Sequence, residues 1–224
     1  MEKPILATTI KDVIINGNSW DEAHYEWYDE REKELEEKGL STEPIDKWRK
    51  LLKENPEEEK KTYFRYVNDV MEFLYPTLFQ EERTRIARES YFDSVLKFIE
   101  KNKDRINEDF LEYLESLKNK YRIAIITTNT WSALEKILKV SNINKDLFDL
   151  IEVSKPEEKD DKIIVFDRFI KKHGKPKFYI GSNEKTRSYC NEKKINYILT
   201  DFYSNNQFPD SIINLKELKE KIPN

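Results

Sequence analysis

The alternation of short apolar runs with helical segments most constrains how this chain can fold. After Asn107, runs typical of strands lie at 121–128, 148–154, 177–181 and 195–200, and helical patterns fall between them at 131–140, 160–173 and 184–193. Such alternation indicates a parallel sheet covered by helices on both faces. A β-rich run at 4–15 predicts the founding strand of this sheet. The expected fold class is therefore α/β, with a Rossmann-like parallel sheet.

A helical block of roughly ninety residues interrupts this pattern. From Ser19 to about Arg105 the chain is dense in Glu, Lys and aromatic residues at helical spacings. Gly39 marks the end of a first helix, and Pro44 and Pro56 mark the starts of two more. We therefore predict an α/β core of residues 1–18 and 106–224, with an all-helical insertion of residues 19–105.

The charge balance excludes two classes of protein. The chain has 40 basic and 44 acidic residues, for a formal net charge of −4. This small net charge is not that of a strongly basic nucleic-acid binder or of a highly acidic disordered chain. One cysteine cannot form an internal disulfide, and no apolar run approaches the ~18 residues of a membrane-spanning helix. We expect a soluble cytoplasmic protein with no membrane partner, and nucleic acid is not the expected ligand.

Four polar segments follow the predicted strands. In parallel α/β sheets, ligands bind outside the carboxyl ends of the strands, near the point where the connections diverge. The residues to consider are therefore those of TIKDV at 9–13, TTNT at 127–130, SKP at 154–156 and GSNE at 181–184.

These segments, in this order and with the helical block after the first, resemble the haloacid dehalogenase (HAD) superfamily of phosphohydrolases. ILATTIKDVII is similar to the family's first motif, IAIITTNT to the second, SKP to the third and KFYIGSNEKT to the fourth. The resemblance covers nearly the whole chain and is of the helical-cap type found in phosphoglycolate phosphatase. It implies a HAD-like core with residues 19–105 as its cap.

The same resemblance shows that the catalytic carboxylates are replaced. Thr9 stands at the position of the nucleophilic Asp, and Lys11 at that of the general acid and base. The acids that help to hold magnesium fall on Ser182 and Thr186. A phosphoaspartyl intermediate requires a carboxylate nucleophile, and Mg²⁺ is usually bound through carboxylates. The pattern therefore predicts a degenerate site without metal or other cofactor.

What remains favours an anion pocket. The resemblance gives Thr128 as a phosphate-contacting hydroxyl and Lys155 as the phosphate-neutralising cation. The full set of predicted anion-binding residues is Thr9, Lys11, Thr128, Asn129, Lys155 and Ser182. Trp20 and Trp131 are candidates for stacking on a ligand, although core packing explains them too. We expect a non-catalytic binder of a phosphate-type anion, or a regulatory protein that uses a protein partner.

Three alternatives stay open. In a shifted register, Asp12 and Glu184 would supply the magnesium carboxylates, and the protein would be an active phosphohydrolase on a small phosphorylated metabolite. A one-residue slip turns strand side chains to the other face, which disfavours this reading. In the second alternative, Thr128 and Lys155 bind no ligand and are structural remnants. Thr128 is then a helix cap, and Lys155 is a solvated loop residue. Finally, the chain could be another doubly wound fold.

The two histidines and the cysteine are predicted to have structural roles. His24 lies among aromatic residues on a helix of the insertion, which indicates core packing. His173 precedes the helix stop at Gly174, and Cys190 is expected to be a small buried hydrophobe. No cysteine or histidine spacing supports a zinc site.

Overall fold

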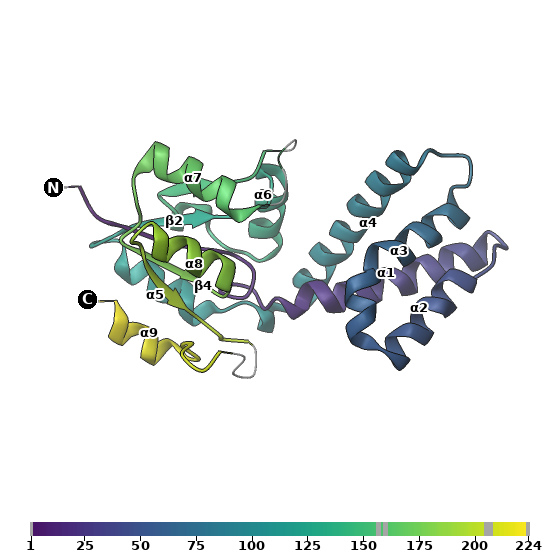
Figure 1. The fold of residues 1–224 in the computed structure, drawn as a ribbon, viewed down its shortest axis with the longest axis horizontal. Coiled ribbons are helices and arrows are strands. Elements are labelled where there is room, and N and C mark those ends of the chain that lie inside the picture. Colours follow the sequence, from purple (N-terminus) through teal and green to yellow (C-terminus); the bar gives the residue numbers. More distant parts are fainter. Residues whose placement is uncertain (1, 156–157, 159–160, 204–207, 223–224) are drawn as a thin grey trace. The chain divides into compact units, whose positions relative to one another are not determined.

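The computed structural model describes residues 2–155, 158, 161–203 and 208–222, and of residues 57–65 it describes the backbone alone. The chain forms two units (Figure 1). One, the core unit, consists of Met1–Gly17 and Asn102–Asn224, and the other, the helical unit, consists of Asn18–Lys101. The helical unit of Asn18–Lys101 lies where the sequence predicts an insertion of residues 19–105.

The core unit is built on one parallel sheet of five strands in the order β3-β2-β1-β4-β5. The strands are β1 (Ile5–Thr8), β2 (Arg122–Ile126), β3 (Leu150–Glu152), β4 (Phe178–Gly181) and β5 (Asn196–Leu199). The α/β fold class with a parallel sheet is confirmed. All four residues of β1 are buried, as expected for a central strand covered on both faces.

Five α-helices accompany the sheet in the described part of the core unit. They are α5 (Glu108–Leu117), α6 (Trp131–Val140), α7 (Lys162–His173), α8 (Glu184–Glu192) and α9 (Leu215–Lys221). Each begins after an Asn, Thr or Asp side chain that accepts a hydrogen bond from the first turn, which satisfies a backbone N–H that has no partner in the helix. Gly174, at φ 88°, ends α7 as predicted.

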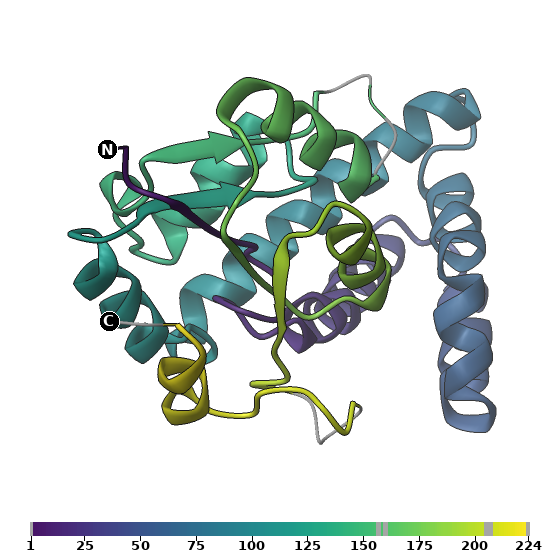
Figure 2. The ribbon, with the colours of Figure 1, turned by 60° about the vertical axis from the view of Figure 1, so that its left-hand side comes forward.

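Helices α7 and α8 pack on one face of the sheet (Figure 2). Their apolar side chains share a core with alternate residues of the strands, including Ala7, Ala124 and Tyr179. Cys190 is fully buried in this core, as predicted from the sequence.

The helical unit contains α1 (Asn18–Glu37), α2 (Glu43–Glu54), α3 (Pro56–Leu74) and α4 (Gln80–Lys101). The two predicted proline starts are confirmed, since Pro44 lies in the first turn of α2 and Pro56 begins α3. Tyr28 and Trp48 stack in the core with ring centroids 3.7 Å apart. His24 packs edge-on against Tyr28 and is 6% exposed, so its predicted core role is confirmed.

The order of the strands locates the binding end of the sheet. From β1 the chain passes to β2 and β3 on one side, and then crosses to β4 and β5 on the other. The connections therefore diverge between β1 and β4, where ligands bind in folds of this kind. In the described part of the chain, every helix is too short or too polar to cross a membrane.

Candidate functional site

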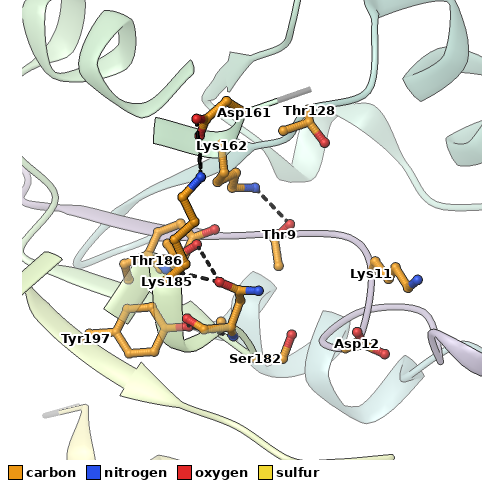
Figure 3. Close-up of a pocket in the computed structure, with 13 residues that line it drawn as sticks. Thr9, Lys11, Asp12, Thr128, Asp161, Lys162, Ser182, Lys185, Thr186 and Tyr197 are labelled. Atoms are coloured by element: carbon orange, nitrogen blue, oxygen red, sulfur yellow. Dashed lines mark hydrogen bonds and ion pairs between the residues drawn. The ribbon is translucent and has the colours of Figure 1, made fainter. Parts of the chain in front are cut away.

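A cavity of about 320 Å³ opens at the carboxyl ends of β1 and β4 (Figure 3). Its walls come from the residue after β1, the turn after β4 and the first turns of α7 and α8. The lining residues are Thr9, Lys11, Asp12, Thr128, Asp161, Lys162, Tyr179, Gly181, Ser182, Asn183, Lys185, Thr186 and Tyr197. The cavity thus lies at the point where the strand connections diverge.

Thr9 is contacted by two side chains in this cavity. Lys162 Nζ donates a hydrogen bond to Thr9 Oγ1 at 3.0 Å, and it also donates to the main-chain oxygen of Ile126 at the end of β2. The phenol of Tyr179 shares a hydrogen bond with Thr9. Burial raises the pKa of Tyr179 well above its ordinary value, so this phenol is neutral. The ammonium group of Lys162 is therefore fixed across the ends of β1 and β2.

The sequence around α7 explains the direction of Lys162. Asp161 caps the helix by accepting a hydrogen bond from the N–H of Ile163, so Lys162 is the first helical residue. Helical side chains lean toward the helix N-terminus. A lysine at this position therefore points back to the strand ends. Its Nζ also lies 5.9 Å from the centroid of the Tyr179 ring, within the range of a cation–π contact.

The turn after β4 is held by Tyr197 of β5. Tyr197 Oη accepts a hydrogen bond from the N–H of Asn183 and donates one to its carbonyl oxygen, each at 3.0 Å. This close approach requires glycine at position 181, because a Cβ there would lie 2.7 Å from Tyr197 Oη and 2.8 Å from Tyr179 Cε1. Ser182 is thereby fixed at the cavity wall.

An ion pair joins the two helix starts within the cavity. Lys185 Nζ of α8 lies 3.2 Å from each carboxylate oxygen of Asp161. The hydrogen bond from the N–H of Ile163 and the interaction with Lys185 lower the pKa of Asp161. Asp161 is therefore a carboxylate at neutral pH, engaged both as a helix cap and as an ion-pair partner.

Four of the predicted anion-binding residues line the cavity together, namely Thr9, Lys11, Thr128 and Ser182. Thr186, the second position at which the resemblance implies an acid, joins them. Asn129 is not among the described lining residues. Its side-chain amide donates a hydrogen bond to Thr127 Oγ1 at 2.9 Å, and its main-chain oxygen accepts one from the N–H of Ser154. Asn129 therefore connects the loops that follow β2 and β3.

Lys162 lines the cavity, whereas Lys155 is not among the lining residues that the structure describes. Lys155 is exposed, and its backbone N–H donates to Glu158 Oε2 at 2.9 Å. Arg168 binds the other carboxylate oxygen of Glu158, and these contacts hold Lys155 in the loop that precedes α7. Pro156, the other residue of the predicted third motif, lies outside the described residues.

The two tryptophans proposed for stacking are outside the cavity wall as described. Trp131 begins α6 and is 42% exposed, and Lys145 Nζ lies 5.8 Å from its ring centroid. Core packing therefore does not account for Trp131. Trp20 belongs to the helical unit, where it is half-buried and its carbonyl oxygen accepts a hydrogen bond from Tyr91 at 3.0 Å.

The donors in this cavity do not suit the magnesium ion that the resemblance implies. Mg²⁺ requires oxygen ligands in octahedral geometry, usually with one or two carboxylates. Of the two lining carboxylates, Asp161 is paired with Lys185, and Asp12 lies against Gly17, where an added Cβ would be 1.9 Å from its Oδ1. Three lysines line the same cavity. Within the described residues, no three His, Cys, Asp or Glu side chains form a metal-binding group.

Glu184, the second carboxylate of the shifted register, does not line the cavity as described. It begins α8 and forms an ion pair with Arg187 at 2.9 Å. Asp12, its proposed partner, does line the cavity, with its backbone in the left-handed region at φ 64°. The structure therefore does not bring these two carboxylates together at the cavity.

Comparison with known proteins gives a structural likeness only. No family model matches the chain, and no curated protein matches it. Among solved structures, YfnB from Bacillus subtilis, assigned as a HAD-hydrolase and crystallised with magnesium, has 16% sequence identity and a TM-score of 0.55, over 99% of both chains.

Two further structures share the architecture. A β-phosphoglucomutase from Clostridium difficile has 15% identity and a TM-score of 0.53, and a 2-haloacid dehalogenase from Pseudomonas syringae has 15% identity and a TM-score of 0.52. Each likeness covers 98% of this chain and 97% of the other. At such identities the fold is what these structures share with the chain. The chain thus has the HAD-like fold, with a parallel α/β core and an inserted helical cap unit.

Proposed function

We propose that this protein binds a phosphate-type anion in the cavity between β1 and β4, without a divalent metal and without hydrolysing its ligand. The observation that carries this proposal is the position of Lys162. Its ammonium group contacts Thr9, the residue that stands where the family has its nucleophile. A fixed cation thus lies at the point where the family's chemistry requires a carboxylate.

The rest of the cavity suits an oxyanion. Thr9, Thr128 and Ser182 offer hydroxyl groups, and Lys11 and Lys162 offer positive charge. Lysine is a common phosphate ligand that acts as a point charge. A volume of about 320 Å³ is at the lower end of the range for small-molecule pockets. We infer a small phosphorylated metabolite as the ligand.

The same geometry argues against hydrolysis. A threonine hydroxyl is a weak nucleophile unless a neighbouring base accepts its proton. The neighbour of Thr9 is Lys162, which donates hydrogen bonds to Thr9 Oγ1 and to the carbonyl oxygen of Ile126. Lys162 thus acts as a hydrogen-bond donor to Thr9, and not as a base placed to accept the proton of its hydroxyl.

The alternative function is phosphohydrolysis by a rearranged site, and the presence of Asp12 on the cavity wall favours it. In that case Asp12 would act without Glu184, which pairs with Arg187. The other lining carboxylate, Asp161, is paired with Lys185, and one remaining carboxylate beside three lysines is a poor magnesium site. We therefore prefer the binding function.

Calorimetric titration with inorganic phosphate, in the presence of a chelator, tests the proposal. We expect binding by the wild type, and we expect Lys162→Gln to weaken it by about tenfold or more, since a charged hydrogen-bond donor is lost. Lys155→Gln is the matched control and should bind as the wild type does. Loss of binding on chelation, or an equal effect of the two substitutions, would refute the proposal. Magnesium-dependent turnover of an aryl phosphate would establish the alternative.

A further inference from the structure

The ion pair between Asp161 and Lys185 introduces a negative charge into a cavity otherwise suited to anions. Both side chains line the cavity, and in Figure 3 Lys185 extends toward Asp161 next to Lys162. The Lys185 side chain is 66% exposed and that of Asp161 is 34% exposed. Neither is locked by burial, so the pair can open at small cost.

We propose that the carboxylate of Asp161 acts as an internal counter-anion. It pairs with Lys185 in the ligand-free protein, and Lys185 leaves it to pair with the anion when one binds. The inference rests on the proposed anion site and adds a third lysine to it. Asp161 then sets the affinity of the site, because each bound anion must compete with its carboxylate for Lys185.

The geometry of neighbouring residues supports this competition. Asp161 directly precedes Lys162, the lysine that contacts Thr9. Both side chains line the same cavity, so an anion bound to Lys162 shares that cavity with the carboxylate of Asp161, and like charges repel. Lys185 has a flexible four-carbon stem with a mobile ammonium group. Movement of that group from Asp161 to the ligand lowers the repulsion and adds an attraction.

Asp161 can be neutralised without loss of its structural role. Its carboxylate caps α7 through the N–H of Ile163, at 3.0 Å. Asparagine is as good a helix cap as aspartate. Asp161→Asn therefore removes the charge and retains the cap, so that a change in affinity reports on electrostatics and not on the fold of α7.

The experiment is a phosphate titration of four proteins at low salt with a chelator. We expect Asp161→Asn to bind inorganic phosphate about three- to tenfold more tightly than the wild type, as the loss of one partly screened charge predicts. Asp161→Asn combined with Lys185→Gln should return to about the wild-type affinity, since the released lysine is gone. Glu89→Gln is the control, because it removes the same charge from an exposed pair with Arg85 on α4, outside the cavity wall.

Each result decides one question. Unchanged or weaker binding by Asp161→Asn, with binding by the wild type, overturns the counter-anion and leaves the proposed function standing. Tighter binding that persists in the double variant overturns the transfer of Lys185. An equal gain with Glu89→Gln shows a general charge effect and also overturns it. Absence of phosphate binding by all four proteins overturns the proposed function together with this inference.

Discussion

Tyr197 binds both backbone polar groups of Asn183 with one phenol oxygen, at 3.0 Å from the nitrogen and 3.0 Å from the carbonyl oxygen. This contact crosses from β5 to the turn after β4. It fixes the turn that places Ser182 at the cavity. The shape of the cavity therefore depends on the position of β5 at the edge of the sheet.

Removal of this phenol should loosen the turn. We expect Tyr197→Phe to lower the free energy of unfolding by about 1 kcal/mol, the usual worth of a net hydrogen bond, and to weaken phosphate binding. Urea unfolding and calorimetry measure the two effects. Tyr203→Phe is the matched control, because Tyr203 donates to the carbonyl oxygen of Ile14 and does not line the cavity as described. An equal loss of affinity in the control would show that the turn is not the cause.

A side chain at position 181 should not fit. Gly181→Ala places a Cβ 2.7 Å from Tyr197 Oη and 2.8 Å from Tyr179 Cε1, so we expect a loss of about 1–3 kcal/mol in the free energy of unfolding. Tyr197→Phe removes the nearer atom and should restore part of this loss in the double variant. Thermal and urea unfolding provide the measurement. Wild-type stability in Gly181→Ala would contradict the close approach.

An acid at position 9 should reduce anion binding. Thr9→Asp places a carboxylate beside Lys162, which now lies 3.0 Å from the hydroxyl, and the new ion pair would neutralise that lysine. We expect phosphate affinity to fall by about tenfold or more, in line with the worth of a charged hydrogen bond. Thr9→Ser retains the hydroxyl and should bind as the wild type does. Tighter phosphate binding by Thr9→Asp would mean that Lys162 does not contact the anion.

His24 should make the helical unit sensitive to acid. Burial lowers the pKa of His24 from 6.5 to about 3, so the folded protein holds this imidazole neutral while the unfolded chain protonates it. The contribution of neutral His24 to the free energy of unfolding is fully present above pH 6.5, and it is lost as the pH falls from there toward about 3. At pH 5 the loss is about 2 kcal/mol by linkage.

His24→Gln removes that titrating group. We expect the free energy of unfolding to fall less between pH 7 and pH 5 in this variant than in the wild type, as measured by urea unfolding at both values. The baseline stability at pH 7 differs between the two proteins and does not enter the comparison. Parallel pH profiles would show that the pKa of His24 is not lowered in the folded protein.

The fold could be predicted from the sequence because its signals are local and repeated. Each strand of the core is a short apolar run, and the helices of the core begin at polar caps such as Thr130 and Asn183. The prolines at 44 and 56 mark helix starts by the geometry of the proline ring. Such features depend on neighbours along the chain, which a single sequence displays.

The site was harder to predict because its contacts join distant segments. Thr9, Lys11, Thr128 and Ser182 follow strands directly, and strand ends can be located from the sequence. Spacing alone could not show that Lys162 lines the cavity, since this depends on where the loop after β3 ends and α7 begins. The pair Asp161-Lys162, a cap followed by a cation, was the signal that could have identified it.

No sequence pattern indicates the hydrogen bonds of Tyr179 and Tyr197. Both residues lie in short apolar strands, β4 and β5. Their phenols reach Thr9 and Asn183 across neighbouring strands, and such pairing depends on sheet order and register. Those properties are set by the assembled sheet and not by the sequence around either tyrosine.

The central place of β1 has a consequence for the order of folding. Its partners β2 and β4 lie more than a hundred residues further along the chain, beyond the whole helical unit. A ribosome therefore releases β1 first and its neighbours much later. The helices of the cap, whose contacts are local, can form during this interval, whereas non-local strand pairing is slow. Synthesis thus leaves the first strand without a partner strand until β2 emerges, and the cavity between β1 and β4 is among the last features to form.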